Sequence, residues 1–209
     1  MKTGVLGGTF DPIHLGHVGA AQAAQRALAL DGILLVPSRI PPHRRDATRA
    51  SADDRFHMAS ITAASRPNWS ASRIELDREG PSYTFDTLTE LRRMPSSFFF
   101  IIGVDAFAEI ATWSRYPAVL DLAHFVVVSR PGFTLDSLQH RVPDLADRMT
   151  TPARFDFSAQ SRIILLEAPT PAISSTEIRR RASAGQDLAG LVPDAVADYI
   201  HAHRLYRGQ

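Results

Sequence analysis

The residues best suited to chemistry lie in residues 7–17, whose sequence is GGTFDPIHLGH. This segment follows an apolar run expected to form a strand, and it leads into an alanine-rich stretch expected to form a helix. Its two leading glycines have no side chains, so a ligand can approach the backbone closely. Its two histidines stand three residues apart at the expected helix start, where N–H groups without intrahelical partners and the helix dipole favour anions. The pattern predicts a polyphosphate site, with the candidate residues Gly7, Gly8, Thr9, Phe10, His14 and His17.

Dinucleotide-binding, P-loop and zinc sites fit this segment less well. The chain contains neither the G-x-G-x-x-G fingerprint of dinucleotide-binding folds nor the G-x-x-x-x-G-K-[ST] loop of P-loop ATPases. A zinc site is disfavoured, because there is no H-E-x-x-H motif and no obvious third ligand nearby. The remaining alternative is a polar helix start in which the two histidines are incidental.

A second candidate segment is residues 173–179, ISSTEIR, which follows the last apolar run. Ser174 and Glu177 have the spacing of a capping box, which by itself predicts only a well-capped helix. Two further hydroxyls and an arginine near the same helix start add donors for phosphate oxygens. The arginines at 180–181 are expected to be solvated. The candidate phosphate-binding residues of this segment are Ser175, Thr176 and Arg179.

Short apolar runs alternate with amphipathic stretches along the whole chain. The strands are predicted at residues 4–7, 33–36, 70–76, 98–102, 125–128 and 163–166. The helices are predicted at residues 15–30, 52–64, 84–93, 135–149 and 193–206. This alternation predicts an α/β fold with a doubly wound, mostly parallel sheet. No composition break marks a linker, so residues 1–209 are expected to form one domain whose helical C-terminal part is roughly 174–209.

Composition limits the classes of partner. The chain has 23 basic and 22 acidic residues, which gives no general reason to bind nucleic acid or an acidic membrane. The absence of cysteine excludes disulfides, thiolate metal sites and a cysteine nucleophile. No apolar run approaches the roughly 18 residues of a membrane span, and no signal-peptide h-region precedes the first strand. A cytoplasmic protein is therefore expected, and the oligomeric state, including a homo-oligomer, stays open.

The two candidate segments resemble the motifs of the nucleotidyltransferases that share [HT]-x-G-H and I-S-S-T-x-I-R; class I aminoacyl-tRNA synthetases carry a related H-x-G-H. Shorter motifs narrow the resemblance. In chain order they include PPHR at 41–44, DR at 54–55, SYT at 82–84, GVD at 103–105, TW at 112–113 and SRPG at 129–132. Together they resemble the bacterial nicotinate-mononucleotide adenylyltransferases over nearly the whole chain.

This resemblance implies a Rossmann-like α/β fold with a C-terminal helical segment. It also implies transfer of AMP from ATP to nicotinate mononucleotide, which yields nicotinate adenine dinucleotide and pyrophosphate in NAD biosynthesis. His14 and His17 would stabilise charge at the reacting α-phosphate, and Arg179 with the helix start at 175–176 would hold the β- and γ-phosphates. Mg²⁺ would bind through the ATP phosphates and water. The attacking phosphate is largely a dianion at neutral pH, so neither a general base nor a covalent enzyme intermediate is expected.

The resemblance also implies a site for the mononucleotide. Trp113 would stack on the pyridine ring, although a core position is the alternative that burial statistics favour. Thr84 stands near a helix start whose N–H groups would take the nicotinate carboxylate. Asp105 would bind the ribose hydroxyls or, alternatively, cap a helix after Gly103. The candidates for further phosphate contacts are His43, Arg44 and Arg130.

Two residues near these motifs are expected to be structural. Trp69 is predicted to pack in the core, and Asp11 is predicted to be a turn residue before Pro12.

Three other functions stay open. A pantetheine-phosphate adenylyltransferase or a cytidylyltransferase would share the phosphate motifs, but these generally lack the combined SYT, TW and SRPG set. A tRNA-binding domain like those of class I synthetases is disfavoured by the short chain, the missing K-M-S-K-S loop and the balanced charge. A non-catalytic nucleotide sensor would bind ATP without releasing pyrophosphate.

Overall fold

The computed structural model describes residues 1–42, 48–129, 135–157 and 160–207. Within these residues, seven strands form one sheet in the order β3-β2-β1-β4-β5-β7-β6, and every neighbouring pair is parallel. The strands are β1 (Lys2–Gly8), β2 (Gly32–Pro37), β3 (Trp69–Ala71), β4 (Ser97–Gly103), β5 (His124–Val128), β6 (Met149–Thr150) and β7 (Ile163–Leu166).

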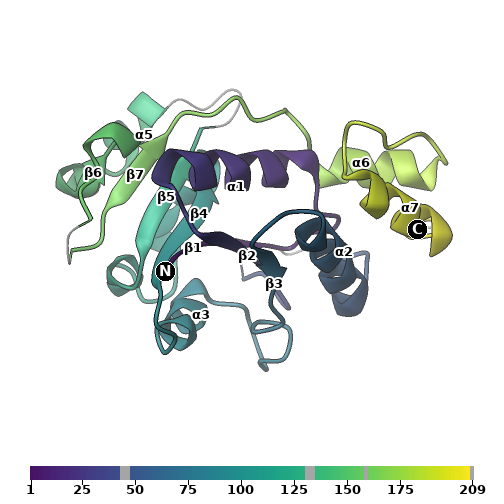
Figure 1. Ribbon diagram of the computed structural model, residues 1–209, viewed down its shortest axis with the longest axis horizontal. Helices are drawn as coiled ribbons and strands as arrows, with labels where there is room; N and C mark the ends of the chain where they lie inside the picture. Colours follow the sequence, from purple (N-terminus) through teal and green to yellow (C-terminus); the bar gives the residue numbers. More distant parts are fainter. Residues whose placement is uncertain (43–47, 130–134, 158–159, 208–209) are drawn as a thin grey trace.

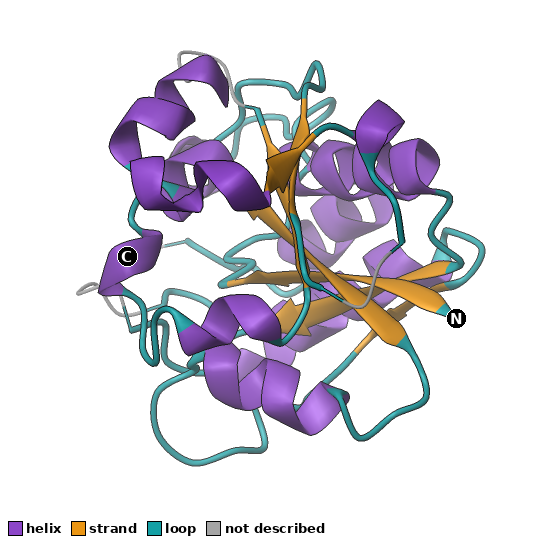
Figure 2. Cartoon of the chain, turned by 90° about the vertical axis from the view of Figure 1, so that its left-hand side faces the viewer, coloured by secondary structure: helices purple, strands orange, loops and turns teal. Residues whose placement is uncertain are grey.

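Helices cover both faces of this sheet (Figure 1), and the side view shows its twist between them (Figure 2). The α-helices are α1 (Leu15–Leu28), α2 (Ala52–Ala64), α3 (Thr84–Leu91), α4 (Val104–Phe107), α5 (Leu135–Arg141), α6 (Ser175–Ser183) and α7 (Asp194–Ala202). Short 3₁₀ helices span Ile110–Thr112, Ala118–Asp121, Pro143–Arg148 and Pro152–Arg154. In the part of the chain that the structure describes, no helix has both the length and the apolar character needed to cross a bilayer.

The central strands divide the core into two apolar clusters, because consecutive strand residues point to opposite faces. Leu6 and Ile101 pack in the cluster that includes buried residues of α1, α2, α6 and α7. Val5 and Phe100 pack in the cluster that includes buried residues of α3, α4 and α5. Burial on both faces explains why these strands are continuous apolar runs. The predicted Rossmann-like, doubly wound fold with a C-terminal helical segment is confirmed.

The strand order reverses between β1 and β4. From β1 the chain proceeds outward to β2 and β3, and it then returns to add β4 and β5 on the other side. A crevice opens outside the carboxyl ends of the strands at such a switch point, and ligands bind there in open α/β sheets. The two strand ends at this point are Gly8 of β1 and Gly103 of β4.

The prediction for residues 135–149 was wrong. A single helix was expected, but α5 ends at Arg141 and is followed by a 3₁₀ helix and then by the edge strand β6. Pro143 explains the break, because proline has no N–H to continue the α-helical ladder.

The prediction for residues 70–76 was also wrong in part. The strand β3 ends at Ala71, and the alternating residues after it form a turn in which the Asp77 N–H donates to the Arg73 carbonyl at 2.9 Å. The helices predicted at 15–30 and 193–206 end earlier, at Leu28 and Ala202.

Candidate active site

The first candidate segment connects β1 to α1, and its two histidines cap that helix. His14 is the N-cap residue. Its N–H donates to Nδ1 of His17 at 3.3 Å, and the His17 N–H donates to Nδ1 of His14 at 3.4 Å. The imidazoles are stacked with their centroids 3.7 Å apart. Because each Nδ1 accepts a backbone proton, a neutral ring carries its own proton on Nε2, which is the donor that each ring can offer to an anion.

Two glycines of this segment stand where a side chain would crowd a neighbouring ring. A Cβ on Gly16 would lie 3.0 Å from the His14 ring, so a side chain there would press on the imidazole. A Cβ on Gly8 would lie 2.8 Å from the ring of Phe10, which is buried and has a φ of 49°. Gly8 and Gly16 therefore leave room for the rings of Phe10 and His14. The predicted approach of a ligand to the backbone of Gly7 and Gly8 stays a prediction, and both residues line the smaller cavity.

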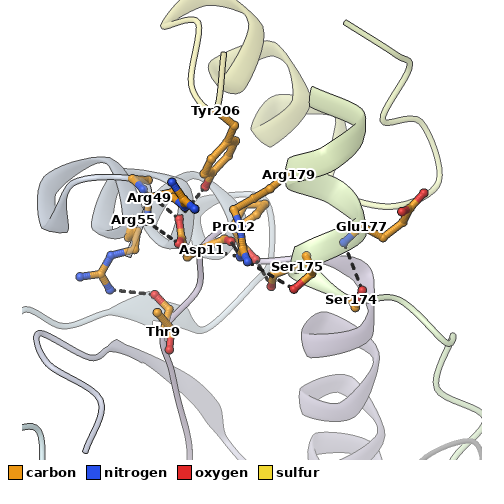
Figure 3. Close-up of polar contacts among 12 residues, drawn as sticks. Thr9, Asp11, Pro12, Arg49, Arg55, Ser174, Ser175, Glu177, Arg179 and Tyr206 are labelled. Carbon is orange, nitrogen blue, oxygen red and sulfur yellow. Dashed lines mark hydrogen bonds and ion pairs between the residues drawn. The ribbon is translucent and has the colours of Figure 1, made fainter. Parts of the chain in front are cut away.

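Asp11 is 3% exposed, and its carboxylate ties the loop to other parts of the chain. Its carboxylate accepts the Arg49 N–H at 2.8 Å, the Ala50 N–H at 3.0 Å and the Tyr206 hydroxyl at 3.0 Å (Figure 3). The expected structural role is confirmed, but it is wider than that of a turn residue. An Asp-Pro pair signals only a local turn, so these distant partners could not be recognised from the sequence.

Arg55 fastens the same loop to the end of β2. It is 1% exposed, and its Nη1 donates to the carbonyls of Thr9 at 2.8 Å and Ser38 at 2.6 Å. From the sequence, Arg55 was only part of a motif and had no assigned role. A buried arginine on a helix cannot be recognised from periodicity alone, because most arginines are solvent-exposed.

The second candidate segment starts α6. The Ser174 hydroxyl accepts the Glu177 N–H at 3.2 Å, as predicted. The reciprocal half of the predicted capping box is not formed, because the Glu177 carboxylate accepts from Arg180 at 2.7 Å and from Arg181 at 2.9 Å. The hydrogen bond from Arg180, followed by the one from Arg181, lowers the pKa of Glu177 to about 2. The two arginines are thus ion-paired rather than simply solvated.

The two segments meet in space, although more than 150 residues separate them. Nη1 of Arg179 donates to the Asp11 carbonyl at 2.7 Å, and the Ser175 hydroxyl donates to the Pro12 carbonyl at 3.2 Å. Nη2 of Arg179 also donates to the Thr176 hydroxyl at 3.3 Å. Figure 3 shows Arg179 reaching from α6 toward the loop. The structure therefore places the start of α6, with Ser175 and Arg179, beside the loop that leads to His14 and His17.

Two cavities lie at the carboxyl ends of the strands. The larger, about 480 Å³, is bounded by the starts of α1 and α6. The smaller, about 320 Å³, is bounded by the ends of β1 and β2 and by the start of α3. They share the wall residues Leu6, His17, Ile101, Ile102, Gly103 and Asp105. The shared wall means that ligands in the two cavities would lie next to each other at the switch point.

The larger cavity is lined by both histidines, whereas the predicted residues Ser175, Thr176 and Arg179 are not in its lining. Its polar lining includes His14, His17, Ser174, Glu177 and Arg181. Among the described residues, Arg181 is the arginine of α6 that lines this cavity. Arg179 instead contacts Asp11 in the connection between β1 and α1, residues 9–14, which we call the phosphate loop.

The smaller cavity contains three of the residues predicted for the pyridine nucleotide, Thr84, Asp105 and Trp113. Trp113 is half-buried in its wall and meets Phe100 edge-on, with centroids 6.2 Å apart. Thr84 opens α3, whose N-cap residue Tyr83 makes no side-chain capping bond. The cavity lining also contains the candidate residues Gly7, Gly8 and Thr9.

Asp105 lies within α4 and lines both cavities. The N-cap of α4 is Gly103. Asp105 is therefore not the helix cap that the sequence left as its alternative role.

Glu75 is a buried carboxylate in the smaller cavity that was not predicted from the sequence. It is 7% exposed and accepts the Thr87 hydroxyl at 2.7 Å. Nη2 of Arg78 donates to that hydroxyl at 2.9 Å. Burial raises the pKa of Glu75, while hydrogen bonds from Thr87 and Ser82 oppose the rise. One glutamate in a charged turn carries no sequence signal that would single it out.

Three predicted contact residues, His43, Arg44 and Arg130, lie outside the described residues. Their predicted phosphate contacts stay predictions.

A parallel sheet whose switch point carries the two predicted phosphate-binding segments, residues 7–17 and 173–179, has the arrangement of a nucleotidyltransferase. The cytidylyltransferase-like family model matches residues 5–181, which include both segments. A probable nicotinate-nucleotide adenylyltransferase of Moorella thermoacetica is 41% identical over 209 residues, covering 99% of this chain and 92% of that protein. One of Thermus thermophilus is also 41% identical, covering 99% of this chain and all of that protein. The chain therefore belongs to the cytidylyltransferase-like family, among its nicotinate-nucleotide adenylyltransferases.

The fold agrees with this assignment. The structure of Plasmodium falciparum nicotinic acid mononucleotide adenylyltransferase complexed with NaAD is similar with a TM-score of 0.72 and 20% identity, covering 98% of this chain and 97% of that one. A nicotinate-nucleotide adenylyltransferase structure from Vibrio parahaemolyticus, itself described as putative, gives a TM-score of 0.62 at 16% identity, covering 100% and 96%. At these identities the likeness shows the fold. The predicted class of enzyme is confirmed by the family.

Proposed function

We propose that this protein transfers the AMP moiety of ATP to nicotinate mononucleotide, producing nicotinate adenine dinucleotide and pyrophosphate in NAD biosynthesis. The observation that carries the proposal is the wall shared by the two cavities, which includes His17 and Asp105. A triphosphate in the larger cavity and a mononucleotide in the smaller one would bring their reacting phosphates together at this wall. The family assignment and the names of the relatives support this choice of substrates.

The larger cavity holds ATP. The Nε2–H groups of His14 and His17 donate to the α-phosphate and stabilise the negative charge that grows there during transfer. Arg179 and the start of α6 at Ser175 and Thr176 hold the β- and γ-phosphates. In support, Arg179 and Ser175 already contact the loop that carries the histidines.

The smaller cavity holds nicotinate mononucleotide. Trp113 stacks on the pyridine ring, and the N–H groups at the start of α3, around Thr84, receive the nicotinate carboxylate. Asp105 accepts from the ribose hydroxyls. A carboxylate accepts hydrogen bonds through both oxygens, whereas an amide has one acceptor oxygen, so this arrangement favours the acid over the amide.

The reaction needs positioning and charge stabilisation rather than proton transfer. An oxygen of the mononucleotide phosphate forms a bond to the α-phosphorus of ATP, opposite the oxygen that bridges to the β-phosphate. The bond between the α-phosphorus and that bridging oxygen breaks, and pyrophosphate leaves. Mg²⁺ would arrive with ATP, held by its phosphate oxygens and by water, and would supply positive charge to the leaving group. Among the described residues, no group of three or more His, Asp or Glu side chains could hold a metal ion.

A substrate panel tests the proposal. Purified protein is incubated with ATP and Mg²⁺ plus nicotinate mononucleotide, nicotinamide mononucleotide or 4′-phosphopantetheine, and both pyrophosphate and the dinucleotide are measured. Fastest release with nicotinate mononucleotide is expected. Faster release with phosphopantetheine would favour the related adenylyltransferase, and ATP binding without any pyrophosphate would favour a non-catalytic sensor.

A further inference from the structure

The C-terminal segment of the described chain reaches back to the phosphate loop. After α7 ends at Ala202, the backbone turns so that Tyr206 is 4% exposed. Its hydroxyl donates to Oδ1 of Asp11 at 3.0 Å, across 195 residues of sequence. Figure 3 shows the tyrosine pointing into the cluster around Asp11 from the side of the C-terminal segment. Neither Tyr206 nor this contact has a part in the proposed reaction.

Asp11 joins three parts of the chain. Its carboxylate accepts the N–H groups of residues 49–50 in addition to the tyrosine hydroxyl. Its backbone carbonyl accepts Nη1 of Arg179 at 2.7 Å, and the same Nη1 is 3.9 Å from Oδ2 of the carboxylate. The side chain and the carbonyl of one residue therefore set the position of the guanidinium proposed to hold ATP phosphates.

The Tyr206 hydroxyl stays protonated and so remains a hydrogen-bond donor in this cluster. Burial, and then the charge of Asp11, raise the pKa of the Tyr206 hydroxyl well above its ordinary value. The hydroxyl therefore keeps its proton over the whole neutral pH range, and it can donate to the carboxylate throughout.

We propose that Tyr206 is a positioning residue for the phosphate end of the active site. This proposal rests on the proposed function. Without the hydroxyl, the buried Asp11 carboxylate loses a donor that fixes its orientation, and Oδ2 of this carboxylate lies 3.9 Å from Nη1 of Arg179. Because a buried charge needs partners, the carboxylate would reorient, and the guanidinium beside it would lose the position from which it holds the ATP phosphates.

The same segment offers a matched control. Tyr199 of α7 also donates its hydroxyl to an aspartate, Oδ1 of Asp54 in α2, at 2.8 Å. This bond also ties the C-terminal segment to the N-terminal half, but Asp54 contacts Ser51 at the start of α2 rather than the phosphate loop. Tyr199→Phe removes the same atom from a similar bond without touching the loop.

The test compares Tyr206→Phe, Tyr199→Phe and the unmodified full chain. For each, the unfolding midpoint, the Kd of a non-hydrolysable ATP analogue and the KM of both substrates are measured. Tyr206→Phe is expected to weaken the analogue about tenfold, the scale of one hydrogen bond to a charged group, while KM for nicotinate mononucleotide stays within about twofold. Tyr199→Phe is expected to leave both affinities unchanged. Equal ATP-analogue affinity in the two variants, or equal loss for both substrates, would overturn the proposal.

A second variant covers the case in which Tyr206→Phe does not fold. Asp11→Asn keeps the backbone carbonyl and the size of the side chain but removes its charge, and the same loss of analogue affinity is expected. Where both variants fold, the double variant should lose no more analogue affinity than the weaker-binding single variant, because both substitutions disrupt one cluster. A loss in the double variant equal to the product of the two single losses, or an Asp11→Asn variant with full affinity, would contradict the proposal. If the unmodified chain makes no dinucleotide, the proposed function fails, but analogue binding still decides the role of Tyr206.

Discussion

The two ends of the active site are held in different ways. At the phosphate end, side chains donate to backbone carbonyls: Arg55 to Thr9 and Ser38, Ser175 to Pro12, and Arg179 to Asp11. At the pyridine end, side chains bond to one another, in the cluster of Glu75, Arg78 and Thr87.

This contrast identifies the end that is sensitive to its surroundings. A backbone carbonyl does not titrate and cannot change rotamer, so these bonds of the phosphate end do not themselves depend on pH. The pyridine end depends on the buried carboxylate of Glu75, whose burial raises its pKa. The half-exposed Glu177 beside the phosphate end has its pKa lowered to about 2 by Arg180 and Arg181. We therefore expect changes at the phosphate end to affect kcat and ATP binding, and changes at the pyridine end to affect affinity for nicotinate mononucleotide. Glu177 and Glu75, one at each end, should give stability opposite dependences on pH.

The largest effect is expected from His17→Ala. It removes an Nε2–H donor from the wall that both cavities share, so kcat should fall about 100-fold or more, the scale for one group that stabilises transition-state charge. Steady-state kinetics with nicotinate mononucleotide and ATP measure it. His201→Ala, on the exposed side of α7, serves as the control. Normal turnover in a folded His17→Ala protein would remove the histidine from the reaction.

Trp113→Ala should separate the two ends. Loss of the stacking surface is expected to raise KM for nicotinate mononucleotide about tenfold while KM for ATP stays unchanged. Trp113→Phe keeps an aromatic face and should recover much of the affinity. If both substrates were weakened equally, Trp113 would instead be supporting the fold through Phe100.

Gly16→Ala tests whether the histidine geometry at the phosphate end is tight. The new Cβ would lie 3.0 Å from the His14 ring, and the resulting displacement should lower kcat roughly fivefold. Gly19→Ala in the same helix is the control, since among the described residues its Cβ would meet Pro171 alone, at an ordinary contact distance of 3.7 Å. That control should be more stable by roughly 0.5–1 kcal/mol, because alanine is the better helix former. Equal kcat in the two variants would show that the ring can move without loss.

The sequence predicts most elements because local patterns specify them. The helix predicted at 52–64 coincides with α2, where Ser51 accepts the Asp54 N–H as N-cap, and the strand predicted at 163–166 coincides with β7. The break after Arg141 and the short strand β6 were not predicted. In the first case a proline interrupts an otherwise helical pattern, and in the second a two-residue strand has no periodicity to detect.

The site was predictable as far as each motif lay within one turn or loop. The sequence placed the two histidines at a helix start and identified the start of α6, and the structure places α6 beside the loop before these histidines. It did not identify Arg55, Glu75 or Tyr206, because each acts through partners distant in sequence, and one residue carries no trace of such a contact. The chemical roles of the candidate residues stay predictions.

Glu75→Gln should change how stability depends on pH. Burial raises the pKa of Glu75 in the folded protein, so the folded state binds this proton more tightly than the unfolded state. The free energy of unfolding of the unmodified protein should therefore fall as pH rises from about 4.5, the ordinary value, through the raised pKa. The variant should lack this loss. Urea unfolding from about pH 4.5 to about pH 7.5 measures it, and Glu79→Gln on the exposed side of the same turn is the control. Parallel curves for Glu75→Gln and the unmodified protein would contradict the assignment.

The smallest effect is expected from Glu177→Gln, and its sign is opposite. The pKa of Glu177 is lowered to about 2, so its ion pairs with Arg180 and Arg181 stabilise the protein above about pH 4.5 and are lost as pH falls toward 2. The unfolding midpoint of the unmodified protein should drop more steeply on acidification than that of the variant. Because these side chains are half-exposed, added salt should reduce the difference between the two proteins. If the unfolding midpoints of the variant and the unmodified protein fall together at low salt between about pH 5 and about pH 2, the ion pairs of α6 add nothing to stability. The two ends would then differ only in the burial of their carboxylates.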